Sequence, residues 1–204
     1  MSKMQSKKVR EQAATGVPAR PGLLFIVSAP SGAGKSTLCR AVRQHFPDLL
    51  YSISYTTRAP RKDEHNGVDY HFISRAAFEK RIAANQWAEW AKVHGNYYGT
   101  DAELLDQGLG EGKDFLLDID VQGTRRILTR YPDAITLFIM PPSPEVLRRR
   151  LENRGTDSPE EIAVRMENAG HEMSCKDCYR HVIINDRLAD ATAELINIIA
   201  SYRS

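Results

Sequence analysis

The sequence predicts an α/β fold in which strands and helices alternate around a mostly parallel central sheet. Three observations support this fold class: apolar runs of strand length, amphipathic helical stretches between them, and a glycine-rich turn that joins the first strand to the first helix. The apolar runs are residues 23–27 (LLFIV), 115–119 (FLLDI), 134–140 (AITLFIM) and 182–184 (VII). Strands that alternate with helices imply a mostly parallel sheet with right-handed crossovers.

The helices have recognisable starts and ends. After the glycine-rich turn, apolar residues recur at helical spacing from Leu38 to Phe46, and Pro47 ends that helix. Further along, Ser158 precedes a proline, and Glu161 is placed to complete a capping box. A last helix is expected over residues 189–202, and the apolar side chains on one of its faces are Leu195, Ile198, Ile199 and Tyr202.

Residues 53–104 interrupt this alternation. They are rich in Arg, Tyr, Thr and Gly, and they contain short strand-like pieces such as residues 70–73 (YHFI), followed by a helix that Ser74 opens. We interpret this segment as a mixed α+β insertion on the core, suited to a second substrate. The predicted organisation is a basic tail at 1–20, a core formed by 21–52, 105–141 and 159–204, the insertion at 53–104 and a short lid region at 142–158.

Composition indicates a soluble globular protein of the cytoplasm. Charged residues make up 26% of the 204 residues and hydrophobic residues 42%. The first twenty residues carry a net charge of +4 within a chain of +2, so the remainder is near neutral and does not favour nucleic acid as a partner. No apolar run is long enough for a membrane span, and the three cysteines do not suggest an oxidising compartment.

Residues 27–37 (VSAPSGAGKST) have the form of a phosphate-binding loop between a strand and a helix. Ala29 stands where the common pattern has its first glycine, and a Cβ is tolerable there if φ stays negative. Backbone N–H groups in such a turn bind phosphate oxygens, and the lysine reaches the outer phosphates. We expect the contacts to a nucleoside triphosphate to come from Ser31, Gly32, Ala33, Gly34, Lys35, Ser36 and Thr37.

A phosphate loop of this kind works with magnesium, for which the Ser36 hydroxyl and a nearby carboxylate are the expected ligands. Asp118 and Asp120 end the run at 115–120, and because side chains alternate along a strand, both are expected on the same face. Asp118 fits the carboxylate on the metal side, acting through water. The alternative is a pair of solvated acids at a strand end.

The insertion contains side chains suited to a second, phosphorylated substrate. Arg58 and Arg61, with Tyr70 further on, offer two guanidinium groups and a phenolic hydroxyl to a phosphate monoester. The stretch "EWAKVHGNYYGT" begins with Glu89, and a buried carboxylate can accept hydrogen bonds from two adjacent N–H donors. Guanine offers such a pair at N1 and N2, whereas adenine does not.

Taken together, these motifs resemble the guanylate kinase family. The stretches "SAPSGAGKST", "TTRAPR", "NGVDYHF", "GNYYGT", "LDIDVQG", "RLENRG" and "IIND" occur in the family's order and span nearly the whole chain after the tail. The resemblance implies a P-loop nucleoside triphosphate hydrolase-like three-layer α/β/α core with a GMP-binding insertion and a lid. It also implies magnesium-dependent transfer of the γ-phosphoryl group of ATP to GMP or dGMP, as in purine metabolism. Alanine at position 29 is common in the family.

The same resemblance implies roles for individual residues. Ser54, Glu89, Thr100 and Asp120 would read the guanine, with Gly99 beside them, and Arg58, Arg61, Tyr70 and Tyr98 would hold the GMP phosphate. Arg154 and Arg165 would close over the transferring phosphoryl group, which places them with Lys35, Arg58 and Asp118 among the catalytic residues. Asn185 would lie near the adenine. Arg187 stands where the family often has a second acid, so the adenine contacts are expected to differ in detail.

Other interpretations remain open. A non-catalytic binding module of the same fold is disfavoured by the intact phosphate loop, and a related kinase acting on another nucleotide or a phosphorylated sugar is disfavoured by Glu89 with Ser54. The partners expected are GMP and ATP, without nucleic acid or membrane, in a monomer or a homo-oligomer. His171, Cys175, Cys178 and His181 have zinc-like spacing, with a redox pair or unpaired side chains as the alternatives.

Overall fold

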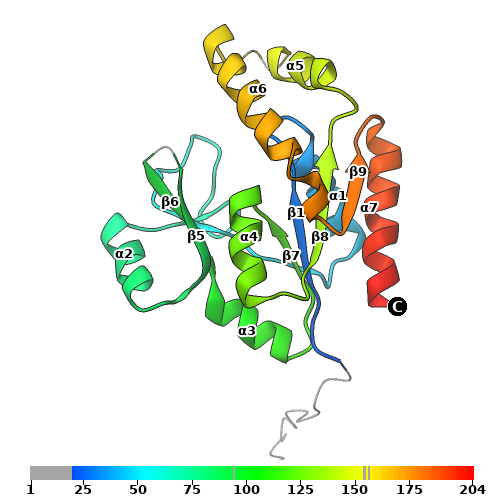
Figure 1. Cartoon of the computed structure of the whole chain (residues 1–204). Helices are drawn as coiled ribbons and strands as arrows, with labels where there is room; N and C mark the ends of the chain where they lie inside the picture. Colours follow the sequence, from blue (N-terminus) through cyan, green and yellow to red (C-terminus); the bar gives the residue numbers. More distant parts are fainter. Residues whose placement is uncertain (1–19, 94, 154, 156) are drawn as a thin grey trace, which may run out of the picture.

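A five-stranded, fully parallel sheet forms the centre of the protein, with the strand order β2-β7-β1-β8-β9 (Figure 1). The structure is a computed structural model that describes residues 20–93, 95–153, 155 and 157–204. Residues 1–19 of the expected tail and Arg154 of the expected lid lie outside the described residues. The strands of the sheet are β1 (Leu24–Ser28), β2 (Leu50–Tyr51), β7 (Phe115–Asp118), β8 (Ile135–Met140) and β9 (His181–Ile184).

Both faces of this sheet are covered by helices, which explains why its strands are continuous apolar runs. Successive side chains of β1 alternate between two hydrophobic clusters: Phe25 and Val27 belong to one, Leu24 and Ile26 to the other. The first cluster is closed by α1 (Lys35–His45) and α7 (Leu188–Arg203), and the second by α3 (Ala102–Gly110) and α4 (Val121–Arg130). The predicted three-layer α/β/α class is confirmed.

A second, smaller sheet lies beside the core and has the order β4-β3-β6-β5 (Figure 1). Helix α2 (Arg75–Ala83) packs on it through Phe78, whose ring stacks on Trp87 at 4.2 Å and on Tyr97 at 5.1 Å. The expected cap is present, because the Ser74 side chain accepts a hydrogen bond from the Ala77 N–H. The strands of this sheet are β3 (Tyr55–Thr56), β4 (His71–Phe72), β5 (Trp87–Val93) and β6 (Asn96–Asp101).

Two helices, α5 (Pro144–Glu152) and α6 (Pro159–Met173), sit beyond the carboxyl ends of the central strands (Figure 1). Helix α6 begins with the predicted capping box between Ser158 and Glu161. Helix α5 packs tightly on the glycine-rich turn, since a Cβ on Gly32 would meet the methyl groups of Leu151 and Leu147 at 2.9 and 3.0 Å. A short 3-10 turn, η1 (Lys176–Cys178), then leads into β9.

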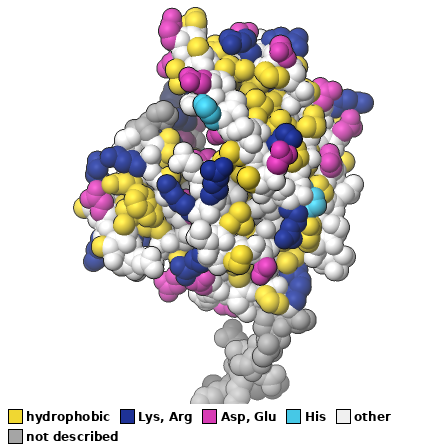
Figure 2. Space-filling model, viewed as in Figure 1, with side chains coloured by type: hydrophobic (Ala, Val, Ile, Leu, Met, Phe, Trp, Pro, Cys, Tyr) yellow, Lys and Arg dark blue, Asp and Glu magenta, His cyan; other side chains and the backbone are white. Residues whose placement is uncertain are grey.

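The face of the molecule shown in Figure 2 carries basic and acidic side chains interspersed with one another. In the described part of the chain, the helices are all too short or too polar to cross a membrane.

Candidate active site

The glycine-rich turn lies between β1 and α1 and has the backbone geometry of a phosphate-binding loop. Gly32 and Gly34 have φ of 95° and 97°, in the left-handed region that glycine adopts without strain. Among the described residues only Asn85 has a positive φ without being glycine, so Ala29 meets the condition set for it. The turn ends at the N-terminus of α1, where free N–H groups and the helix dipole favour an anion.

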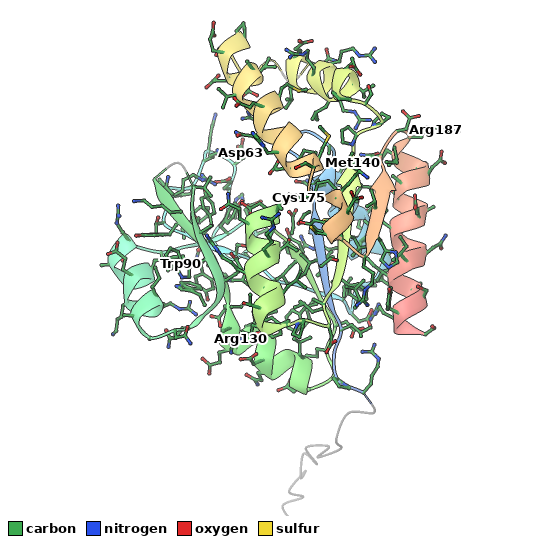
Figure 3. All side chains as sticks on the ribbon, viewed as in Figure 1. Asp63, Trp90, Arg130, Met140, Cys175 and Arg187 are labelled. Atoms are coloured by element: carbon green, nitrogen blue, oxygen red, sulfur yellow. The ribbon has the colours of Figure 1, made fainter. Side chains whose placement is uncertain are left out.

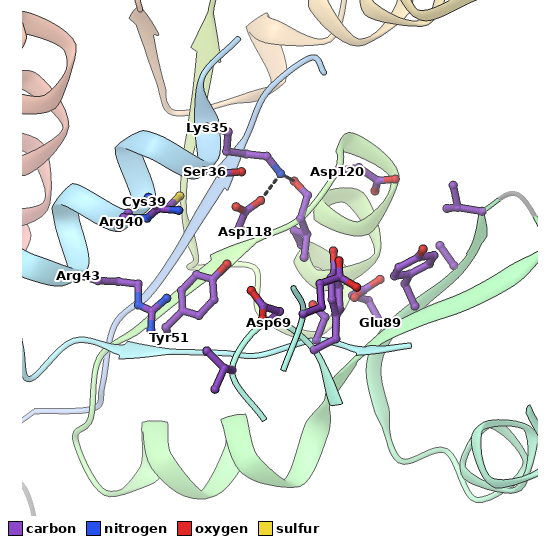
Figure 4. A pocket seen from close by; sticks show the side chains of 18 residues that line it. Lys35, Ser36, Cys39, Arg40, Arg43, Tyr51, Asp69, Glu89, Asp118 and Asp120 are labelled. Carbon is purple, nitrogen blue, oxygen red and sulfur yellow. Dashed lines mark hydrogen bonds and ion pairs between the residues drawn. The ribbon is translucent and has the colours of Figure 1, made fainter. Parts of the chain in front are cut away.

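Lys35 and Asp118 meet across the carboxyl ends of two neighbouring strands. Val27 of β1 pairs with Asp118 of β7, so the loop that follows β1 begins next to this carboxylate. The Lys35 ammonium group forms an ion pair with Asp118 and lies 3.4 Å from the carbonyl oxygen of Ile119 (Figure 4). Burial alone would lower the pKa of Lys35, but the negative charge of Asp118 outweighs it and raises that pKa. Lys35 is therefore held as a cation at the loop.

A cavity of about 530 Å³ opens between the phosphate loop and the second sheet. Its walls include eight of the residues that the sequence analysis selected: Lys35, Ser36, Ser54, Tyr70, Glu89, Tyr98, Asp118 and Asp120. A smaller hollow of about 310 Å³ lies over the loop itself, lined by residues of the loop from Ala29 to Thr37 and by Glu172 of α6. The two spaces share Lys35 and Ser36, so an occupant of one would meet an occupant of the other at these residues.

Glu89 provides a buried carboxylate in the wall of the larger cavity. It is 7% exposed, and its Oε1 accepts a hydrogen bond of 2.9 Å from the hydroxyl of Thr100, its partner across β5 and β6. Burial raises the pKa of Glu89 to about 7, against the lowering effect of that hydrogen bond. A Cβ on Gly123 would lie 3.3 Å from Oε2 of Glu89 and 3.2 Å from Oδ1 of Asp120, so the missing side chain leaves room for both carboxylates.

Arginines of the insertion are arranged around a carboxylate rather than facing the cavity freely. The Arg58 guanidinium donates to both oxygens of Glu64 at 2.8 and 2.9 Å, and Glu64 itself lines the cavity. Arg58 also lies over the Tyr70 ring at 5.5 Å. The side chain of Arg61 is 77% exposed and reaches Glu64 at 3.8 Å. Tyr70 and Tyr98 contact each other edge to face, with ring centroids 5.9 Å apart.

Helix α6 touches the phosphate loop at Ser31. Arg165 donates a hydrogen bond of 3.2 Å to the Ser31 hydroxyl and pairs with Asp157 at 3.2 Å. Asn185 contacts the loop from below: its side-chain N–H donates to the Ala33 carbonyl oxygen at 2.7 Å. Asn185 lines neither of the two cavities.

Several side chains of the cavity were not selected from the sequence. Arg40 and Arg43 lie three residues apart on α1 and face the cavity, with Arg43 over the Tyr51 ring at 4.3 Å. Asp69 comes from the opposite side, in the loop before β4. A signal for the two arginines was available in the sequence. Arg40 and Arg43 are three residues apart in the predicted helix, so they lie on one face of it.

Two expectations from the sequence need correction. Strand β7 ends at Asp118, and Asp120 is instead the N-cap of α4, accepting a hydrogen bond of 2.7 Å from the Gly123 N–H. Both carboxylates still line the cavity, because the chain turns directly after the strand.

The zinc-like spacing of His171, Cys175, Cys178 and His181 suggested one shared site, but α6 ends at Met173 and both cysteines lie beyond it. Cys175 lies between α6 and α4, where Arg125 donates to its sulfur at 3.2 Å (Figure 3). His181 points to α7 and contacts the Tyr202 hydroxyl at 2.9 Å. Over the described part of the chain, no three His, Cys, Asp or Glu side chains are grouped so that they could hold a metal ion, which argues against the zinc interpretation.

Comparison with known proteins agrees, along nearly the whole chain, with the family resemblance found in the sequence. The family model described as guanylate kinase matches residues 22–202. A guanylate kinase of Geobacter sulfurreducens is 47% identical over 180 residues, covering 88% of this chain and 89% of the relative. A guanylate kinase of Symbiobacterium thermophilum is 46% identical over 189 residues, covering 92% and 90%. The crystal structure of guanylate kinase from Anaplasma phagocytophilum superposes with a TM-score of 0.71 at 31% identity, covering 90% of this chain and 87% of that one. The chain belongs to the guanylate kinase family.

Proposed function

We propose that this protein transfers the γ-phosphoryl group of ATP to GMP, and to dGMP, giving ADP and the nucleoside diphosphate. The observation that carries the proposal is the position of Glu89, a buried carboxylate in the same cavity as Lys35 and Asp118. A carboxylate there suits the N1–H and N2–H donors of guanine, while the phosphate loop suits the triphosphate. The names of the relatives agree with this acceptor and this reaction.

On the acceptor side, Glu89 would accept from guanine N1 and N2, and Ser54 would donate to O6. Thr100 would act through Glu89, since its hydroxyl already donates to that carboxylate. Gly99 supports the same strand pair, because a Cβ there would come within 2.9 Å of the Phe78 ring. Asp120 faces the same cavity and would contact the base from the start of α4.

The phosphate of GMP would be held by Arg58, Arg61, Tyr70 and Tyr98. In the structure Arg58 is bound by Glu64, so the substrate phosphate would either share this guanidinium or displace the carboxylate. A phosphate monoester is largely ionised near neutral pH, and it needs no strong general base to act as a nucleophile. One of its oxygens would attack the γ-phosphorus in line, forming the new P–O bond as the bond to ADP breaks.

On the donor side, the N–H groups of residues 31–37 would hold the phosphates, with Lys35 moving from Asp118 toward the β- and γ-phosphates. Ser36 and Asp118 fit magnesium, because hydroxyl and carboxylate oxygens are its preferred ligands and both side chains line the same cavity. Magnesium bound with ATP would neutralise charge on the transferring phosphoryl group. Arg165, already at Ser31, and Arg154 would cover that group and exclude water.

The insertion at 53–104 and the lid at 142–158 would close on the core, formed by 21–52, 105–141 and 159–204, when both substrates are bound. On the face shown in Figure 2, basic and acidic side chains are interspersed, which supports small-molecule substrates rather than nucleic acid. A cytoplasmic location suits an ATP-dependent enzyme with free cysteines.

One steady-state experiment tests this function: GMP, dGMP, AMP, CMP and UMP are compared as acceptors with ATP and magnesium. We expect GMP to give the highest kcat/KM, dGMP to follow, and the other three to be poorer by at least about 100-fold, because a site built to pair polar donors rejects bases that lack them. Comparable kcat/KM for AMP and GMP would contradict the role of Glu89. Omission of magnesium should reduce turnover to near background, and full turnover without a divalent cation would contradict the assignment of Ser36 and Asp118.

A further inference from the structure

Asn185 is buried beneath the phosphate loop and fixed there from several sides. It is 4% exposed and directly follows β9. Its backbone N–H donates to the Met140 carbonyl oxygen at 2.8 Å, and its own carbonyl oxygen accepts from the Arg150 guanidinium at 2.9 Å. Its side-chain Nδ2 donates to the Ala33 carbonyl oxygen at 2.7 Å. The amide is therefore anchored to the core sheet and to α5, and it presents its donor to the loop.

The hydrogen bond to Ala33 determines which way the next peptide group faces. The structure contains no cis peptide bond among the described residues, so the Ala33–Gly34 peptide is trans and planar. In a trans peptide the C=O and the following N–H point in opposite directions. Because the Ala33 carbonyl points down to Asn185, the Gly34 N–H points the other way, toward the hollow above the loop that Gly34 lines. We propose that Asn185 is a positioning residue: by holding the Ala33 carbonyl it aims the Gly34 N–H at a bound phosphate.

The packing of Gly34 shows how closely the same amide group approaches the loop. A Cβ built on Gly34 would clash with Nδ2 of Asn185. The glycine is thus required by its φ of 97° and also by the approach of this amide. The orientation of the amide is defined as well, because turning it over would place Oδ1 against the Ala33 carbonyl oxygen. Oδ1 has no hydrogen-bond partner among the described residues. The hydrogen bond from Nδ2 to the Ala33 carbonyl oxygen is therefore the one that this side chain makes within the described part of the chain.

This inference rests on the proposed binding of ATP by the loop, but it assigns Asn185 a different task from a contact with adenine. A residue that acts on the base affects only ligands that carry a base. A residue that orients the loop affects every ligand that places phosphate there, inorganic tripolyphosphate included. The two roles therefore separate when binding of ATP and of tripolyphosphate is compared.

The test uses the full chain with Asn185→Asp, which is nearly isosteric but replaces the donor with an oxygen facing the Ala33 carbonyl. We expect the dissociation constants of ATP and tripolyphosphate, measured by calorimetry, to rise by a similar factor of at least about tenfold. The KM for ATP should rise in parallel, while the KM for GMP stays within about twofold. Asn185→Ala removes the donor without adding repulsion, and it should give a smaller loss in the same pattern. If the aspartate variant does not fold, the alanine variant carries the test.

Thr136→Val is the matched control, because it removes the hydrogen bond of 3.0 Å from the Arg180 N–H to the buried Thr136. Thr136 lies near the amino end of β8, whereas the phosphate loop follows the carboxyl end of the parallel strand β1. It should lower thermal stability without changing either dissociation constant. Unchanged binding of tripolyphosphate in both Asn185 variants would overturn the inference, as would a loss confined to ATP or a wild-type chain that does not bind tripolyphosphate. A wild-type chain that binds it but does not phosphorylate GMP would overturn the proposed function and leave this inference standing.

Discussion

The Thr100 hydroxyl donates to Oε1 of Glu89 inside the second sheet, so one oxygen of this buried carboxylate is fixed and Oε2 lies toward Asp120. The two residues are paired directly across β5 and β6. Strand pairing therefore sets the direction of the carboxylate before any ligand arrives, which is the pre-organisation that a specific base contact needs.

This relationship leads to the first prediction, for Glu89→Gln. Glutamine can still accept from Thr100, but its NH₂ group meets the N–H donors of guanine, where only an acceptor fits. We expect kcat/KM for GMP to fall by about 100-fold or more, with the KM for ATP within about twofold. Steady-state kinetics with each substrate varied in turn measures both. Glu79→Gln, an exposed position on α2, is the control and should change neither value. Equal loss for GMP and ATP would argue against this role.

The second prediction concerns pH. Since burial raises the pKa of Glu89 to about 7, the free enzyme holds a neutral carboxyl below that pH, and a neutral carboxyl cannot accept from both guanine donors. We expect kcat/KM for GMP to fall about tenfold per pH unit below 7, while the KM for ATP changes little. The ionisation of the GMP phosphate acts in the same direction near pH 6. A Glu89→Gln variant separates the two effects, because its profile should keep only the phosphate ionisation. An unchanged midpoint in that variant would contradict the assignment.

The same carboxylate should cost stability at high pH. A carboxyl whose folded pKa lies above its unfolded value of 4.5 is most favourable when protonated. Its contribution is complete below pH 4.5 and is lost as the pH rises through 7. Glu89→Gln should therefore be more stable than the wild type by about 1–3 kcal/mol at pH 8, with no such advantage at pH 5. Urea unfolding at the two pH values measures this difference, and a destabilised variant at pH 8 would show that the buried charge is well compensated.

The sequence was sufficient to predict four of the five strands of the central sheet, because the apolar runs and the glycine-rich loop are local patterns. It missed β2, which is only two residues long and forms no apolar run. The capping box at Ser158 was likewise readable, since its two partners are three residues apart. Asp120 was misplaced for a related reason: alternation along a strand holds only while the strand continues, and the chain ends β7 at Asp118 to begin α4.

Contacts between distant segments could not be predicted from spacing. The pairing of Arg58 with Glu64 depends on how a polar loop folds back, and nothing in the residue types favours Glu64 over the neighbouring acid Asp63. The contact of Asn185 with Ala33 joins residues 152 positions apart, and only the strand order β1-β8-β9 brings them together. Local patterns give the elements, whereas the order of strands in the sheet decides which loops meet.

Another such contact gives a prediction on stability. Asp114 joins both ends of the described chain, because it accepts hydrogen bonds from Arg20, from the Leu23 N–H and from Arg203, and its side chain is 3% exposed. Burial would raise its pKa, but these three donors outweigh burial and lower it to about 2. Asp114→Ala should lower the free energy of unfolding by about 2–4 kcal/mol, since two arginines lose a buried partner.

Asp48 offers the matched control for Asp114, because it pairs with the same Arg203 but its side chain is 73% exposed. Asp48→Ala should cost less than about 1 kcal/mol. The pH dependence has a defined sign: a lowered pKa gives stability that is present above the unfolded value of 3.8 and lost as the pH falls toward 2. The free energy of unfolding of the wild type should therefore fall with pH in that acid range. The Asp114→Ala variant should lack this part of the fall. Equal losses for the two variants would contradict the importance of burial.

The last prediction concerns Lys35, whose ammonium group is paired with Asp118 at the mouth of the phosphate loop. ATP must take this cation from Asp118, which leaves the carboxylate available to the proposed magnesium site. Lys35→Ala should reduce turnover by about 100-fold or more, because a charged donor to the transferring phosphoryl group is lost. The fold should remain, since the backbone of the loop is set by Gly32, Gly34 and the contact below it. Circular dichroism and turnover are measured together, with the exposed Lys113→Ala as control. Near-normal turnover in Lys35→Ala would refute the assignment of the loop. In a phosphate-binding loop that catalyses this transfer, the lysine cation paired here with Asp118 is needed to bind the outer phosphates.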